Sequence, residues 1–378
     1  MSMTRRQRLM ASLEGRPVDR PPVSFYEIDG AQDTSDKDPY NIFSDPTWAP
    51  AIALAREKTD RIVRMGIGFK NAPPDPLAEL TRTRHWEENG SRFGMTEIRA
   101  GTRTLTTRWR RDRDVDTVWT TEHLLKDVDD FKAWLELPEP VFGGEPDTDR
   151  FLRTERELGE DGICMIDSGD PICSAAPLFD MGTFTVMAMT EPELFRKALD
   201  RFARIYWPRT EAIAKALPGR LWRICGPEYA SPPYLPPRLF EEYVVAYDTP
   251  MVRSILKHGG FPRIHSHGRL KDILDLIAAT GCTGLDPIEP PPQGDVSLEY
   301  VRRNYGAQMT LFGNIEASEI ENLEPAAFEK RVAQAIREGT AGSGRGFVLH
   351  PSACPYGRKL SARAMRNYET MVRLAERG

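Results

Sequence analysis

The most constraining feature of the sequence is the alternation of short β-type runs with longer helical patterns. Eight such runs recur along the chain, at residues 22–25, 61–65, 163–167, 221–225, 261–265, 283–286, 309–312 and 347–350. This alternation is typical of βαβ units around a parallel sheet. Eight strands are the number that closes a barrel, so the sequence predicts the α/β class. The expected fold is a (β/α)8 TIM barrel with residues 1–378 as a single domain.

The helical patterns between these runs carry start and stop signals. Thr190-Glu191-Pro192-Glu193 reads as a capping box that opens a long helix. A final helix over residues 361–375 would close the ring of helices. The stretch 91–121 breaks the rhythm with β-prone, alternating residues. It predicts an antiparallel β-hairpin inserted after the second strand, which would serve as a lid, as a homodimer contact, or as both.

Composition excludes several classes of protein. The net charge of −5 is mild, and no basic stripe of the kind that binds nucleic acid is present. No run approaches the roughly 18 apolar residues that a membrane span needs. Residues 1–20 lack the apolar core of a secretory signal, and the five cysteines are scattered rather than paired. We therefore expect a cytoplasmic protein that binds neither nucleic acid nor membrane.

The sharpest local signal is the run His265-Ser266-His267-Gly268. Alternate residues of a strand point to the same side, so both imidazoles would project together at the end of the fifth strand. Neutral imidazole is a common metal ligand. The alternative is that one histidine packs inside the barrel while the other is exposed at the start of the next helix.

Two further residues are candidate metal ligands. Glu228 follows the strand before the histidines, and Cys354 follows the last strand. All eight loops at the carboxyl ends of the strands converge on one opening, so both side chains could reach the histidines. Alternatively, Glu228 caps its own turn or pairs with an arginine, and Cys354 is inert.

Several polar and aromatic residues occupy comparable positions after strands. They are candidates for acid–base chemistry, substrate binding or orientation of a ligand. Asp167 could act as a general acid or base, and Glu289 and Asn314 could hydrogen-bond a substrate. Tyr26, Glu27 and Asp29 after the first strand would bind a cationic group or line a solvated rim, and Tyr229 would offer an aromatic contact to a flat or apolar ligand.

Together these motifs make the chain resemble members of the uroporphyrinogen decarboxylase superfamily. The resemblance covers nearly the whole chain and rests on residues 4–9, 17–23, 226–229, 265–268, 294–295, 313–315 and 346–352. Two branches of the superfamily compete. The true decarboxylases carry no metal, and His350 matches their histidine after the last strand. Their arginine motif is absent here, where Tyr26-Glu27-Ile28-Asp29 stands, and an acidic mouth would repel their polycarboxylate substrate.

The other branch contains corrinoid-linked methyltransferases that bind zinc. The resemblance implies an H-x-C pair on the fifth strand and a cysteine after the last strand. In this chain His267 replaces the first cysteine, and Cys354 lies close to the position of the second, with a register shift of one residue. Two imidazoles and Glu228 would form a harder site than thiolates do, and would leave zinc a stronger Lewis acid.

These arguments lead to one hypothesis and two alternatives. The hypothesis is a zinc-dependent methyltransferase component for O-demethylation, which moves a methyl group between a methoxylated or similar methylated small molecule and a corrinoid. No D-x-H-x-x-G corrinoid-binding motif occurs in the chain, so a separate corrinoid protein would be the partner. The alternatives are a metal-free carboxy-lyase that uses Asp167 and His350 as acid–base groups, and a non-catalytic binding protein on the same fold.

Overall fold

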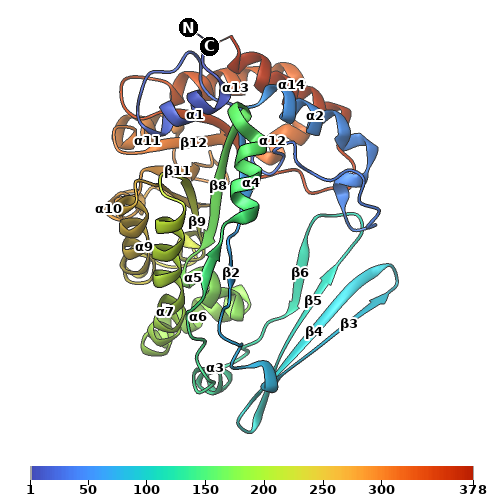
Figure 1. The fold of residues 1–378 in the computed structure, drawn as a ribbon, viewed down its shortest axis with the longest axis vertical. Coiled ribbons are helices and arrows are strands. Elements are labelled where there is room, and N and C mark those ends of the chain that lie inside the picture. The colour runs from blue at the N-terminus through green and yellow to red at the C-terminus, as the bar shows by residue number, and fades with distance from the viewer. Residues whose placement is uncertain (1, 378) are drawn as a thin grey trace.

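The computed structural model describes residues 2–377, and its centre is a parallel sheet of seven strands in the order β1-β8-β9-β10-β11-β12-β13. Figure 1 shows this sheet curling, with helices along its outer side. The strand bounds are β1 Arg61–Met65, β8 Gly162–Gly169, β9 Leu221–Cys225, β10 Phe261–Ser266, β11 Gly284–Pro287, β12 Thr310–Ile315 and β13 Phe347–Pro351. The fold is therefore mixed α/β and TIM-like, and these strands fall on seven of the eight predicted runs.

The eighth predicted run, residues 22–25, makes only a single parallel bridge, between Val23 and Leu349 of β13. Its other side is held by Asp60, whose backbone N–H donates to the Val23 carbonyl at 2.7 Å and whose carboxylate accepts from the Val23 N–H at 2.9 Å. The run is short for a physical reason. Pro22 has no N–H to donate to a ladder, and Tyr26 turns the chain with a φ of 48°.

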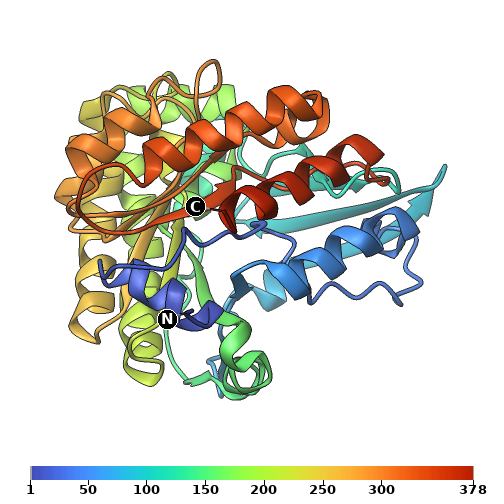
Figure 2. The same cartoon turned by 90° about the horizontal axis from the view of Figure 1, so that it is seen from above.

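Helices cover the outer side of the sheet and one end of the molecule. Figure 2 shows α2, α13 and α14 close together at that end, and both α2 and α13 contact α14. The helix bounds are α1 Arg5–Leu13, α2 Ala49–Lys58, α3 Val128–Leu135, α4 Asp149–Leu158, α5 Pro171–Ala175, α6 Met181–Thr190, α7 Pro192–Ala216, α8 Pro237–Phe240, α9 Ala246–Lys257, α10 Leu274–Ala279, α11 Leu298–Tyr305, α12 Ala317–Asn322, α13 Pro325–Gly339 and α14 Ala362–Ala375.

One helix start differs from its prediction and another agrees. Thr190 is the last residue of α6 and its hydroxyl donates to the Val186 carbonyl, so it does not cap α7. The N-cap of α7 is Glu191, which makes no side-chain capping bond. The capping-box interpretation was wrong because α6 ends at Thr190, directly before α7 begins at Pro192. The final helix begins after Ser361, whose hydroxyl accepts from the Ala364 N–H.

The region after β1 is a four-stranded antiparallel sheet rather than a hairpin confined to residues 91–121. Its strands are β3 Thr81–Glu88, β4 Ser91–Ala100, β5 Arg103–Arg111 and β6 Val118–Glu122, in that order. Figure 1 shows it projecting away from the parallel sheet. Its β5–β6 connection returns to the loop after β13, where Val115 bridges Gly357. The short strands β2 Gly68–Lys70 and β7 Glu145–Asp147 pair with each other nearby.

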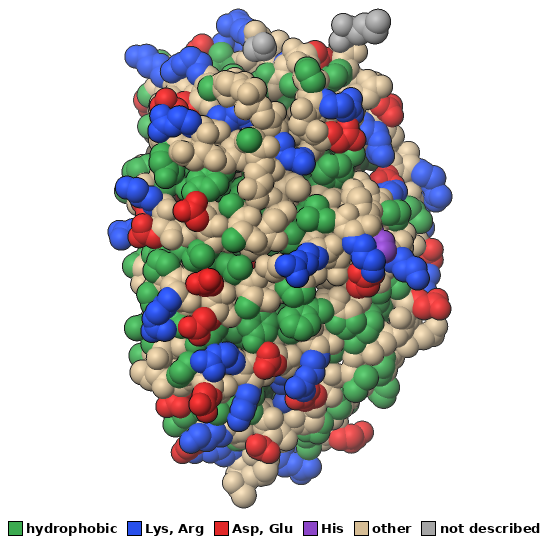
Figure 3. Space-filling view, turned by 90° about the vertical axis from the view of Figure 1, so that its left-hand side faces the viewer, with side chains coloured by type: hydrophobic (Ala, Val, Ile, Leu, Met, Phe, Trp, Pro, Cys, Tyr) green, Lys and Arg blue, Asp and Glu red, His purple; other side chains and the backbone are tan. Residues whose placement is uncertain are grey.

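The surface is mixed in charge, and the buried apolar residues form one large cluster and one small one. Figure 3 shows Lys and Arg side chains interspersed with Asp and Glu over the helical face of the molecule. Within residues 2–377 no single helix is long and apolar enough to cross a membrane. The segments Pro171–Leu178 and Met181–Thr190 meet the length and composition test only as a pair bent by 112°. One large cluster of buried apolar residues packs between the sheet and its helices.

Candidate active site

The carboxyl ends of β8, β9, β10 and β11 bring charged residues into two adjacent rows. Asp167, Arg223 and Arg263 are register partners across β8, β9 and β10. One step of two residues further along, Cys225, His265 and Asp286 are partners across β9, β10 and β11. Register partners on neighbouring parallel strands point to the same side of the sheet. The two rows therefore form one continuous polar layer at this end of the sheet.

The first row is an ion pair between Arg223 and Asp167. The guanidinium donates twice, from Nε to Oδ1 at 2.7 Å and from Nη2 to Oδ2 at 3.0 Å. Its remaining nitrogen, Nη1, donates to the hydroxyl of Tyr26. Burial and the charge of Asp286 raise the pKa of Tyr26, so its hydroxyl stays protonated at neutral pH. Tyr26 is thus a fixed polar group at the mouth of the strands.

Asp286 of the second row joins its neighbour His265 to Arg263 of the first row. Asp286 is fully buried, and its two oxygens lie 2.9 Å from Arg263 Nε and 2.7 Å from His265 Nδ1. Burial opposes the ionised carboxyl, but the charge of Arg263 and the His265 contact outweigh it and hold the pKa of Asp286 well below its usual range. An ionised carboxylate can only accept, so Nδ1 of His265 carries the proton. The other ring nitrogen of His265, Nε2, faces the Tyr26 hydroxyl at 3.5 Å.

His267 is held in the same way by a different carboxylate. Its Nδ1 lies 2.7 Å from Glu289 Oε1, and the other oxygen of Glu289 accepts from the Gly268 N–H at 2.7 Å. Burial disfavours the charged imidazole, yet the hydrogen bond and charge of Glu289 prevail and the pKa of His267 is raised. The His265 and His267 rings lie edge to face, with centroids 4.7 Å apart.

This arrangement fits two ligands of a metal ion. In zinc sites a ligating histidine commonly donates its other N–H to a carboxylate, which fixes the tautomer and the ring orientation. His265 with Asp286, and His267 with Glu289, both have that arrangement. Within residues 2–377, however, no three His, Cys, Asp or Glu side chains already stand close enough together to hold an ion. A third ligand would have to swing toward the pair.

A cavity of about 520 Å³ opens beside His267. Its walls include Glu228, Glu289, Tyr229 and Tyr234, together with Arg269, three prolines and several smaller or neutral residues. Two carboxylates and one imidazole therefore share a pocket that also has aromatic surface. This is the size and character of a small-molecule site.

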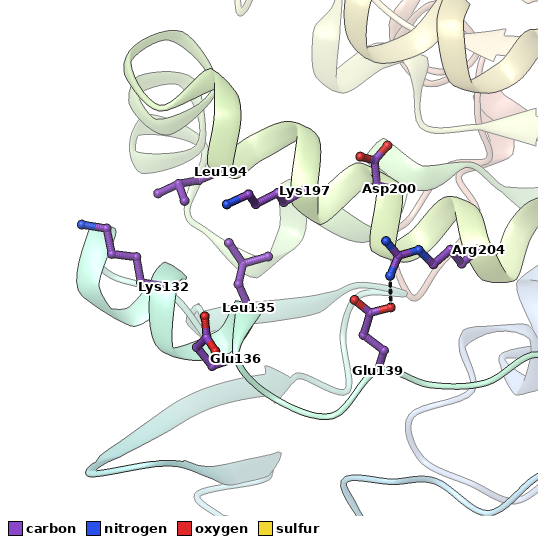
Figure 4. Close-up of a pocket in the computed structure, with 8 residues that line it drawn as sticks. All are labelled: Lys132, Leu135, Glu136, Glu139, Leu194, Lys197, Asp200 and Arg204. Carbon is purple, nitrogen blue, oxygen red and sulfur yellow. Dashed lines mark hydrogen bonds and ion pairs between the residues drawn. The ribbon is translucent and has the colours of Figure 1, made fainter.

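A second hollow, of about 280 Å³, lies on the surface between α3 and α7, away from the strand ends. Figure 4 shows its lining, where Arg204 pairs with Glu139, and Asp200 accepts from the Tyr247 hydroxyl at 2.7 Å. Nothing in that lining resembles a catalytic group.

Tyr229, His350 and Asn314 are three further residues predicted for the site. Tyr229 lines the cavity, and His350 lies beneath Tyr26, with ring centroids 4.8 Å apart. Burial and the charge of Arg263 lower the pKa of His350 to about 3, so its ring is neutral. Asn314 is 2% exposed, and its Oδ1 accepts from Arg331 of α13 at 3.0 Å, so its amide is already engaged.

Cys354 is buried and does not form a ready ligand set with the histidines. Its sulfur donates to the carbonyl of Pro355, and burial and the charge of Glu27 raise the pKa of its thiol. Glu228 differs, because it lines the same cavity as His267 and its charge contributes to raising the pKa of that histidine. Its Oε2 also accepts from the Gly226 N–H at 3.0 Å, which is the contact expected from the alternative that Glu228 caps its own turn.

The mouth is not the acidic surface that the sequence suggested. Glu27 pairs with Arg64 at 3.3 Å, and Asp29 accepts from the Ala31 N–H and the Gln32 amide instead of facing the opening. Arg64 and Arg223 both lie against the ring of Tyr26, at 5.9 and 5.5 Å from its centroid. The carboxylates of Glu27 and Asp29 are therefore engaged by neighbouring groups of the chain.

Sequence reasoning missed Arg223, Arg263 and Asp286, which are central to the polar layer. A signal was available. Each arginine stands inside an apolar strand, in Leu221-Trp222-Arg223-Ile224-Cys225 and in Phe261-Pro262-Arg263-Ile264-His265. Charged residues are almost never buried in such strands unless they are paired. Arg263 is also two residues before His265, so it had to share that histidine's side of the sheet.

A buried carboxyl pair behind the site leads to a prediction on pH. Asp170 and Asp248 are both fully buried, and neither oxygen of Asp248 has a hydrogen-bond partner in residues 2–377. Burial raises the pKa of Asp248 to about 8. The folded chain therefore binds more protons than the unfolded chain between roughly pH 4 and 8, and this group's contribution to stability is lost as pH rises through that window.

We expect Asp248→Asn to remove that loss. Urea unfolding gives the free energy of unfolding of the variant minus that of the unsubstituted chain. This difference should be at least about 2 kcal/mol larger at pH 9 than at pH 5. The exposed control Asp272→Asn should show no such trend. An equal difference at both pH values would contradict the buried-carboxyl interpretation.

The comparisons with known proteins agree with this architecture. A family model described as uroporphyrinogen decarboxylase (URO-D) matches residues 147–357. Among solved structures, a methyltransferase from Methanosarcina mazei superposes with a TM-score of 0.58 at 16% identity, covering 100% of this chain and 99% of that one. This likeness shows the fold. A D-psicose 3-epimerase crystallised with D-fructose reaches a TM-score of only 0.33 at 11% identity, over 60% of this chain and 81% of its own.

No curated protein matches the chain. The family model alone covers more than half of the 378 residues, including every strand from β8 to β13 and both histidines of the H-x-H pair. The chain therefore belongs to the uroporphyrinogen decarboxylase (URO-D) family.

Proposed function

We propose that this chain is the zinc-dependent component of a methyltransferase. It would move a methyl group from a methoxylated or similar methylated small molecule to a corrinoid held by a separate protein. The observation that carries the proposal is the pair His265 and His267, whose rings lie 4.7 Å apart and whose Nδ1 atoms each contact a carboxylate. The methyltransferase of the same fold supports it as well.

We propose His265, His267 and Glu228 as the zinc ligands. The two Nε2 atoms are the ring nitrogens that Asp286 and Glu289 do not contact, and Glu228 shares the wall of the cavity with His267. Lewis-acid polarisation of the oxygen that leaves the methyl group is the chemistry that zinc would supply when bound. Asp286 and Glu289 would keep both imidazoles oriented. Because the pKa of His267 is raised, ion binding must displace a proton and should weaken as pH falls.

The other residues of the site would bind the substrate and exclude water. Tyr229 and Tyr234 would contact a flat or apolar substrate in the cavity. Tyr26, fixed by Arg223 and lying 3.5 Å from His265 Nε2, would donate a hydrogen bond to a substrate oxygen at the mouth. Asp167 would act indirectly, by holding Arg223 in place.

Several further expectations belong to the same proposal. The chain would act in the cytoplasm as one domain, and neither nucleic acid nor a membrane would take part. The corrinoid protein would approach the open end of the cavity, because reduced cobalt must reach the methyl group. The antiparallel sheet β3–β6 would serve as a lid or as a homodimer contact, since it returns to the loop after β13.

The first test is the metal content of the full chain. We expect about one zinc ion per chain, in the three-ligand plus substrate arrangement typical of catalytic sites. The purified protein should also form methylcobalamin from chemically reduced cobalamin and one member of a panel of methoxylated aromatic compounds. Metal analysis that finds neither zinc nor another transition metal would contradict the proposal.

One observation favours a second candidate, a metal-free carboxy-lyase. Arg64 and Arg223 lie against Tyr26 at the mouth, where they could neutralise a substrate carboxylate. Asp167 and the neutral His350 would then be the acid–base groups. Release of carbon dioxide from a carboxylated substrate, with the rate unchanged by added chelator, would favour this function over methyl transfer.

A further inference from the structure

Two of the five cysteines lie together at the carboxyl end of β9, beside the candidate active site, and neither has a role in the proposed function. Cys173 is in α5, and Cys225 is the last residue of β9. Both are partly exposed, whereas Cys164, Cys282 and Cys354 are buried. The two accessible thiols are thus also the two neighbouring ones.

Backbone geometry brings these two cysteines together. Cys225 is the register partner of Gly169, the last residue of β8. A Cβ atom built on Gly169 would lie 3.2 Å from the sulfur of Cys173, and one built on Gly226 would lie 2.8 Å from the Cys173 Cβ. The Cys173 side chain therefore occupies the space left by two missing side chains. One is that of Gly169, the register partner of Cys225, and the other is that of Gly226, the next residue after Cys225. The Cys173 side chain thus packs against the Cys225–Gly226 end of β9.

The surroundings make the two sulfurs chemically unequal. The neighbouring Cys173 thiol lowers the pKa of Cys225 against the opposing effect of burial, and the charge of Arg223 adds to the lowering. The neighbouring Cys225 thiol and burial raise the pKa of Cys173. In pairs of this kind the sulfur with the lower pKa attacks first, and its neighbour resolves the product.

We propose that Cys173 and Cys225 form a reactive dithiol, a modification site that a low-molecular-weight disulfide converts into an intramolecular disulfide. The Cys225 thiolate attacks one sulfur of the disulfide RSSR, which forms a Cys225–SR bond and releases RS⁻. Cys173 then loses its proton and attacks the Cys225 sulfur, which forms the Cys173–Cys225 bond and releases a second RS⁻. The two cysteines are oxidised, and RSSR is reduced to two RSH.

The bond would have a local structural effect. Cys225 is followed by Gly226, Pro227 and Glu228, so the disulfide would tie the start of α5 to the turn that carries Glu228. It would also draw the Cys225 sulfur away from the Ser168 carbonyl, to which it now donates at 3.4 Å. The inference does not depend on the proposed function, because it rests on the two thiols alone.

The test uses the full chain and 2-hydroxyethyl disulfide, a small neutral probe. Mass spectrometry after alkylation should show the five free thiols falling to three, with one crosslinked peptide pair that contains Cys173 and Cys225. Dithiothreitol should restore all five. Retention of five free thiols, or a crosslink between any other pair, would overturn the proposal.

Single substitutions test the order of attack. Cys173→Ser should stop at the first step and accumulate a mixed disulfide at Cys225, whereas Cys225→Ser should leave Cys173 free. Cys282→Ser, a buried control, should behave like the unsubstituted chain. Circular dichroism would confirm that each variant is folded. Equal labelling in the Cys173→Ser and Cys225→Ser variants would contradict the assigned roles.

Discussion

Replacing His265 and His267 together by alanine is expected to lower bound zinc from about one ion per chain to less than about 0.1, and methyl transfer by at least about 10³-fold. Two of the three proposed ligands are lost, and Glu228 alone cannot retain an ion against water. Metal analysis and the rate of methylcobalamin formation measure the two effects. His123→Ala, at a partly exposed histidine whose Nδ1 lies 3.0 Å from the Pro177 carbonyl oxygen, is the matched control.

A graded variant separates ligand loss from general damage to the site. Glu289→Gln keeps the shape of the side chain that orients His267 but removes its charge, so zinc affinity should fall by about 10- to 100-fold while the ion still binds at saturation. The metal-free lyase makes the opposite prediction for the double alanine variant, which would keep its activity. A double variant that retains zinc would show that the ion, if present, is bound elsewhere.

Much of the fold could be predicted from the sequence because each strand is a short apolar run with its own turn signals. β1 and β9 begin and end where the sequence placed them. The run at residues 22–25 was harder, since its prolines reduce it to one bridge at Val23. The predicted hairpin, residues 91–121, was shorter than the antiparallel sheet, which begins at Thr81 and ends at Glu122. β3 is mostly exposed and polar, with little of the apolar alternation that marks a strand.

The candidate site was predictable where it depends on local sequence and not where it depends on pairing between strands. His265 and His267 could be placed together because alternation within one strand decides their side. Asp286 could not be assigned to His265, because that contact depends on the register between β10 and β11. The same limit applies to Glu228 and Cys354. Only the fold shows that Glu228 lines the cavity with His267 while Cys354 is buried against Pro355.

Removing the charge of Asp286 is expected to have the largest effect on stability of any single change in the site. Arg263 is 1% exposed, Asp286 is fully buried, and Nη1 and Nη2 of Arg263 have no hydrogen-bond partner in residues 2–377. In Asp286→Asn the guanidinium would remain buried without a counter-ion. Breaking a buried pair in this way costs about 3–5 kcal/mol. Urea unfolding at pH 7 would measure the loss.

Two measurements can distinguish loss of the counter-ion of Arg263 from a simple packing defect as the cause of the lost stability. A double variant, Arg263→Met with Asp286→Leu, removes both charges and should recover most of the lost stability, because well-packed apolar residues can replace a buried ion pair. The pH dependence gives a second check. The depressed pKa of Asp286 adds stability above the ordinary aspartate range, and this is lost as pH falls. The gap between the unsubstituted chain and Asp286→Asn should therefore narrow below about pH 4. A double variant no more stable than Asp286→Asn would show that shape, rather than the unpaired charge, sets the cost.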